Sequence, residues 1–192
     1  MLDIANIEEI RRILLLLPEL VDDHERRDPA FPSKVKDWLA QVERVLSGNR
    51  LVTAADVAAL RSALIGAERG IVPVGLVIEG RSTRRKIRES VALDVLRKAE
   101  GLVSASIAAD GARLSKAEQL GRELVAFAER KGILGGVLGA SQVTQTQVKE
   151  MWKAVVDDKE LGPFATRLAA SVRLRDIPIL LDQALTAFGL PL

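Results

Sequence analysis

The chain has 192 residues, of which 48% are hydrophobic but only 3% aromatic, and its formal net charge is +2. A chain of this length can bury a core without covalent cross-links, and an interior of Ala, Val, Leu and Ile is typical of closely packed helices. The absence of cysteine excludes disulfides, thiolate metal ligands and cysteine nucleophiles. We therefore expect a single all-helical domain over residues 1–192.

The N-terminal sequence MLDIANIEEIRRILLLLPEL carries acidic residues before its apolar run and has no small-residue cleavage site. These features predict a helix of the mature protein and not a secretory signal. The longest apolar runs, IVPVGLVI and GILGGVLGA, are much shorter than the roughly 20 residues that a spanning helix needs. We expect no transmembrane segment and a cytoplasmic location.

The first part of the chain predicts two or three helices. One or two lie near the N-terminus, interrupted by Pro18. Over residues 33–48 the apolar positions follow helical spacing, with Ser33 placed as an N-cap and Gly48 as a stop.

The next segment predicts a helix over residues 53–70. Thr53 stands three residues before Asp56, which is a variant of the capping box, and Gly70 closes the helix. Residues 71–80 are rich in β-branched side chains, but a lone strand would have no partner, so a buried connector is favoured over a short strand.

The middle of the chain predicts two further helices. The first runs from about residue 81 to about residue 109. The second begins at a capping box formed by Ser115 and Glu118 and stops at Gly132.

Three shorter helices are expected toward the C-terminus, over residues 144–155, 163–174 and 177–189. Pro163 and Pro178 stand where the first turn of a helix tolerates proline. The sequence thus predicts a bundle of about eight helices.

A glycine-rich stretch separates these last helices from the middle of the chain. Four glycines within GILGGVLG would each cost about 1 kcal/mol relative to alanine in a helix. We expect a hinge near residues 132–140 and take residues 132–143 as the one candidate sub-boundary of the domain.

Five basic side chains fall within eight positions at the start of the middle helix, and we call them the basic cluster. On a helical seam of alternating steps of four and three, positions 81, 85 and 88 lie in line with positions 92, 95 and 99, which are apolar. If Ser82 or Thr83 caps this helix, three of the basic residues occupy its first turn, where positive charge opposes the helix dipole. The cluster consists of Arg81, Arg84, Arg85, Lys86 and Arg88.

A run of charges can be an ordinary solvated face, but a cluster in this position favours anions nearby, for which two sources stay open. Residues 1–32 hold 4 basic and 8 acidic side chains, whereas residues 81–131 hold 12 basic and 7 acidic ones. The cluster could pair with acids of the chain itself or with the phosphates of a partner, which arginine contacts in bidentate fashion. The internal candidates are Glu19, Asp22, Asp23, Glu25 and Asp28.

No catalytic or metal-binding motif is present in the sequence. The P-loop and dinucleotide patterns are absent, and His24 is the only histidine. The carboxylates beside His24 point in different directions on a helix, so we expect no metal, no cofactor and no enzymatic activity.

These observations predict a non-enzymatic subunit or adaptor of a larger assembly, with protein partners. Its basic cluster would contact the backbone of RNA or DNA, and aromatic residues for base stacking are lacking around the cluster. The alternative is a protein-interaction or oligomerisation scaffold, including a homo-oligomer, in which the cluster is paired internally.

Overall fold

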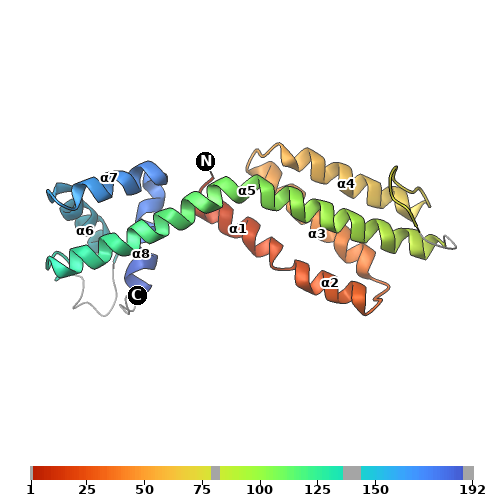
Figure 1. Cartoon of the computed structure of the whole chain (residues 1–192), viewed down its shortest axis with the longest axis horizontal. Helices are drawn as coiled ribbons and strands as arrows, with labels where there is room; N and C mark the ends of the chain where they lie inside the picture. The colour runs from red at the N-terminus through yellow and green to blue at the C-terminus, as the bar shows by residue number, and fades with distance from the viewer. Residues whose placement is uncertain (1, 79–82, 136–143, 188–192) are drawn as a thin grey trace. The chain divides into compact units, whose positions relative to one another are not determined.

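The computed structural model describes residues 2–78, 83–135 and 144–187, and every regular element in these ranges is helical (Figure 1). This confirms the all-α prediction with about eight helices. None of the described helices combines the length and the hydropathy needed to cross a membrane. The elements are α1 (Ile4–Leu14), α2 (Leu17–Glu25), α3 (Phe31–Gly48), α4 (Thr53–Glu68), α5 (Arg84–Arg130), α6 (Gln145–Asp157), α7 (Gly162–Ser171), the 3-10 helix η1 (Leu174–Asp176) and α8 (Ile177–Ala187).

Contacts along the chain define two units, and the division falls inside α5, between Ala109 and Asp110. We refer to residues 4–109 as the N-terminal unit and to the chain from Asp110 onward as the C-terminal unit. The single domain predicted from the sequence stays a prediction. Most of the predicted hinge at 132–140, and of the candidate sub-boundary at 132–143, lies outside the described residues.

The core of the N-terminal unit forms around α3. The helices α3 and α4 are an antiparallel pair, and α1 and α2 pack against α3. Phe31, Val35 and Leu39 of α3 are almost completely buried, in one cluster with side chains from the first half of α5. Trp38 is also buried, and its indole Nε1 donates a 3.0 Å hydrogen bond to the carbonyl oxygen of Ile13. This bond satisfies the one polar atom of the buried indole.

The predicted N-caps of α3 and α4 are wrong. Helix α3 begins at Phe31, two residues before Ser33, because burial of Phe31 and a proline in the first turn extend the helix. Helix α4 begins at Thr53 itself, and Val52 is its N-cap, with no side-chain hydrogen bond. Packing therefore decides where these two helices begin.

The helix ends predicted at Gly48, Gly70 and Gly132 are confirmed, whereas the end predicted near residue 109 is wrong, because α5 continues to Arg130. Gly48 is the last residue of α3. Gly70 and Gly132 follow the ends of α4 and α5 with φ angles of 85° and 72°, in the left-handed region that glycine adopts without steric cost. Their amides donate to carbonyl oxygens of the preceding turn, at Ala67 and Glu129.

The separate helix predicted to begin at Ser115 does not exist. Helix α5 runs without interruption for 47 residues, and Ser115 lies in its interior. Leu114, Ala117 and Leu124 are buried and continue the helical spacing of apolar positions across the supposed boundary. A capping-box pattern inside a strongly helical sequence was therefore misleading, because Ala, Leu, Lys and Glu favour continuation.

The connector over residues 71–78 forms no strand, but the predicted burial is only partly correct. Leu76 and Ile78 pack against the core, whereas Val74 and Val77 are exposed. Proline and glycine form a turn in this segment, and its apolar side chains are divided between the core and the solvent.

In the C-terminal unit, prolines stand in the first turns of α7 and α8, as the sequence predicts for Pro163 and Pro178. Helix α6 begins with a capping box that the sequence reading missed. Thr144 Oγ1 accepts from the amide of Gln147, and the side chain of Gln147 accepts from the amide of Thr144. Both amides would otherwise lack a partner at the helix end.

Asp158 connects the ends of three helices of the C-terminal unit. Its carboxylate accepts from Lys131 Nζ at 2.9 and 3.0 Å and from the backbone amides of Glu160 and Leu161 at 2.8 and 2.9 Å. The Lys131 ammonium, followed by these two amides, lowers the pKa of Asp158 from 3.8 to about 2.

We expect Asp158→Asn to lower the stability of the C-terminal unit at neutral pH and to make that stability less sensitive to acid. A carboxyl with a lowered pKa stabilises the folded state above its unfolded pKa, and this contribution is lost as pH falls from 3.8 to about 2. Melting temperatures measured across this range should fall more steeply for the wild type than for Asp158→Asn. The exposed neighbour Asp157, replaced by asparagine, serves as the control, and equal profiles for both variants would contradict the assignment.

Candidate functional site

The basic cluster opens α5. Thr83 caps this helix, since its Oγ1 accepts from the amide of Lys86 at 3.2 Å, which confirms one of the two predicted caps. Arg84, Arg85 and Lys86 follow in the first turn and are exposed. Arg81 lies outside the described residues. Three cations therefore stand at the helix end that favours anions.

Arg88 differs from these three residues because it is half-buried, and its Nε is buried without a hydrogen-bond partner among the described residues. It lies close enough to Glu68 to lower the pKa of that carboxyl, after the larger effect of Lys36, whose Nζ is 2.7 Å from Glu68. Arg88 therefore belongs to the packing of α5 against α4 more than to the exposed surface.

The seam predicted along α5 is confirmed in its apolar part. Ala92, Val95 and Ala99 are buried in the core of the N-terminal unit. At the start of the helix, however, Ile87 occupies the buried side, while Arg85 is turned toward solvent with 64% of its side chain exposed. The core-facing stripe thus shifts around the helix near its first turn.

Arg85 has two contacts that fix its direction. Its Nε donates to Glu89 Oε1, one turn along α5, at 2.7 Å. Its Nη2 donates to the carbonyl oxygen of Arg27 at 3.4 Å, so the side chain reaches the turn that connects α2 and α3. The first turn of α5 and this turn therefore adjoin one another.

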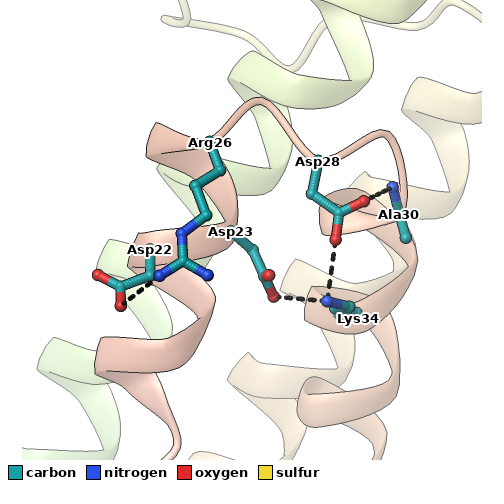
Figure 2. Close-up of polar contacts among 6 residues, drawn as sticks. All are labelled: Asp22, Asp23, Arg26, Asp28, Ala30 and Lys34. Atoms are coloured by element: carbon teal, nitrogen blue, oxygen red, sulfur yellow. Dashed lines mark hydrogen bonds and ion pairs between the residues drawn. The ribbon is translucent and has the colours of Figure 1, made fainter.

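Two of the acidic residues considered as internal partners of the cluster are held by a lysine of α3 (Figure 2). Lys34 Nζ lies 2.8 Å from Asp23 Oδ2 and 2.9 Å from Asp28 Oδ2. These hydrogen bonds, that to Asp23 first, raise the pKa of Lys34. The amide of Ala30 and the Lys34 ammonium lower the pKa of Asp28.

A third acidic residue pairs with the residue that caps the end of its helix. Asp22 of α2 lies 3.8 Å from Arg26, the C-cap of α2, and both side chains are mostly exposed (Figure 2). Such pairs contribute little to stability. Glu19 and Glu25 form no ion pair with any residue in the described ranges. The acids of α2 and the following turn are thus engaged mainly by Lys34 and Arg26.

A cavity of about 650 Å³ lies where the turn between α2 and α3 meets the first turn of α5. Carboxylates and cations both line it, so its charge is mixed. Phe31 is the one aromatic hydrocarbon side chain among its described lining residues. Its charged and polar lining comes from His24, Glu25, Arg27, Asp28, Thr83, Arg85, Lys86 and Glu89.

The sequence reading missed the basic residues of this turn. Arg26 and Arg27 are both exposed, and Arg27 lines the same cavity as Arg85 and Lys86 at the start of α5. Arg27 has a φ of 57°, a left-handed conformation that usually favours glycine at a helix end. The sequence contains a signal for these basic residues, because two arginines follow Glu25. They were overlooked because residues 1–32 are mainly acidic.

Within the described ranges, no three histidine, aspartate or glutamate side chains are grouped so that they could hold a metal ion. Comparison of the chain with protein-family models, with curated proteins and with solved structures found no match.

Proposed function

We propose that the protein is a non-enzymatic helical subunit or adaptor of a larger assembly and that it contacts nucleic-acid backbone through its basic cluster. One observation carries the proposal: Arg84, Arg85 and Lys86 are exposed at the start of α5, while Asp23 and Asp28 are held by Lys34. Three cations of this helix end are thus exposed, while Lys34 engages these two carboxylates.

The chemistry of the surface suits phosphate. Guanidinium groups bind phosphate oxygens in bidentate fashion, and Arg27, which lines the same cavity as Arg85 and Lys86, widens the surface beyond a single helix turn. Phosphate contacts position a protein on nucleic acid without reading its sequence. We therefore propose binding to RNA or DNA that is independent of base sequence.

The second candidate is a protein-interaction or oligomerisation scaffold in which the cluster is paired internally. Its supporting observation is Arg85, which is tied to Glu89 and to the Arg27 carbonyl. An exposed pair one turn apart on a helix contributes only about 0.3–0.5 kcal/mol. Such a pair is easily exchanged for a phosphate contact, so we rank this candidate second.

The test is the triple change Arg84→Glu, Arg85→Glu, Lys86→Glu. The wild type should bind unspecific oligonucleotides with strong salt dependence, and the variant should lose about two to three units of the slope of log affinity against log salt. The variant should remain folded, because glutamate suits the first turn of a helix. Fluorescence anisotropy at several salt concentrations measures the slope, and circular dichroism checks the fold.

A matched control carries the same change in net charge elsewhere. Arg122→Glu, Lys149→Glu, Lys153→Glu alters three exposed basic residues of the C-terminal unit. This control should bind as the wild type does. If both variants lose the same affinity for oligonucleotides, the effect is one of net charge and the basic cluster is not the binding site. A wild type that binds no polynucleotide at low salt would also contradict the proposal. Unfolding of the cluster variant would instead favour the scaffold.

A further inference from the structure

A second cavity of the N-terminal unit, of about 790 Å³, lies between α2 and the first half of α5. Its apolar lining comes from both sides. Leu17 and Val21 belong to α2, and Leu93 and Leu96 belong to α5. Val21 is 41% exposed and Leu93 is half-buried, so these side chains remain accessible in a groove whose deeper residues belong to the core.

The spacing of the lining residues gives the groove its length. On α5 they run from Leu93 to Ser104 in steps of three and four, which places them on one helix face. At a rise of 1.5 Å per residue this face is about 16 Å long, or about three helical turns. On α2, Leu17, Val21 and Glu25 follow steps of four and form the opposite wall.

The charges beside the apolar residues are mainly negative. Asp22 and Glu25 line the groove from α2, and Glu100 lines it from α5. Against these three carboxylates, the described lining residues include one arginine, Arg97, and no lysine. Glu25 and Glu100 form no ion pair with any described residue. The groove thus presents unpaired carboxylates on opposite walls, with a sign opposite to that of the basic cluster.

We propose that this groove binds an amphipathic helix of a partner protein, whose apolar stripe packs on Leu17, Val21 and Leu93 and whose flanking lysines or arginines face Glu25 and Glu100. Helix-in-groove recognition uses anchors at steps of three and four over two to three turns. The groove has this length, and its free carboxylates select a basic helix over an acidic one. The site is distinct in chemistry from the phosphate-binding surface proposed above.

The probe is a designed peptide of about 16 residues, helical and labelled, with leucines on one face and lysines on both flanks. A second peptide carries glutamate in place of each lysine. The lysine peptide should bind the full chain saturably in fluorescence anisotropy, and the glutamate peptide should bind at least about tenfold more weakly, because like charges face each other across the groove.

Exchange of charge in the protein should reverse this preference. The double change Glu25→Lys, Glu100→Lys should weaken the lysine peptide at least about tenfold and strengthen the glutamate peptide. The control Glu9→Lys, Glu129→Lys changes two exposed carboxylates outside the groove and should leave both affinities within about twofold. Val21→Ser tests the apolar contact without a change of charge and should weaken both peptides.

Three results would overturn the proposal. They are no saturable binding of the lysine peptide, equal losses in the groove variant and its control, or a wild type that binds both peptides equally. Sedimentation of the protein alone tests a second copy as occupant: a dimer that Val21→Ser dissociates would overturn the partner-helix assignment. Circular dichroism of each variant ensures that lost binding does not reflect lost fold.

Discussion

Val95→Asp is expected to unfold the N-terminal unit. Val95 is 1% exposed on the core-facing stripe of α5, and a carboxylate there would lose its hydration without gaining a partner. A buried, unpaired charge costs at least several kcal/mol, which approaches the total stability of an ordinary domain. Thermal melts followed by circular dichroism should show loss of the cooperative transition of this unit.

Arg84→Asp provides the matched control on the same helix. Position 84 is exposed in the first turn, where aspartate interacts favourably with the helix dipole. We expect its stability to equal that of the wild type or to rise by less than about 1 kcal/mol. Equal tolerance of both substitutions would mean that α5 does not pack as described.

The second large effect concerns the C-terminal unit. Leu168 of α7 is completely buried, and Leu168→Ala should lower the free energy of unfolding by about 2–5 kcal/mol through lost burial and a residual cavity. Among the residues that the structure describes, the core cluster around α3 contains none beyond Ile107. We therefore expect calorimetry to show two transitions, of which only one shifts in this variant.

Leu39→Ala is the reciprocal variant, because Leu39 is equally buried in the N-terminal unit. It should shift the transition that Leu168→Ala leaves in place. A single transition that moves by the same amount in both variants would contradict two independently melting units. It would support the single domain that the sequence predicts.

Helix ends marked by glycine were more predictable than helix beginnings marked by a hydroxyl residue, and the physical reason is local. Gly70 and Gly132 end helices because their backbone conformation is open to glycine at no steric cost, a property of the residue itself. Ser33 and Ser115 were misread as caps because many positions can offer a hydroxyl. Burial of Phe31 and of Leu114 decided the outcome, and burial depends on the rest of the fold.

The candidate site was predictable in its position but not in its pairing. The density of charge around Arg84, Arg85 and Lys86, with Thr83 as a cap, indicated the start of a helix. The predicted seam, however, put the arginines on the core-facing side, whereas Arg85 is exposed. That Asp23 and Asp28 would face Lys34 follows from the turn between α2 and α3, which brings residues of two helices together. The spacing of residues along the sequence does not indicate which side chains this turn brings together.

The groove was not predictable for a related reason. Val21 and Leu93 are ordinary members of two amphipathic helices when each is read alone. Their shared exposure, and the free carboxylates of Glu25 and Glu100 on facing walls, result from the separation between α2 and α5. The helical period of about 3.6 residues identifies the apolar face of each helix, but it does not indicate which two helices lie side by side or how far apart they are.

The continuity of α5 has a consequence for the order in which the protein folds during synthesis. Once residue 109 has left the ribosome, every side chain of the N-terminal core is available, and that unit can form. Synthesis of residues 110–192 takes roughly 4–17 seconds at about 5–20 residues per second. Throughout that interval Leu114, Leu124 and Val125 of the second half of α5, which are buried in the folded protein, lack the rest of the C-terminal unit. Nascent chains halted within this interval therefore expose an apolar helix, and they are the species most prone to aggregate or to recruit a chaperone.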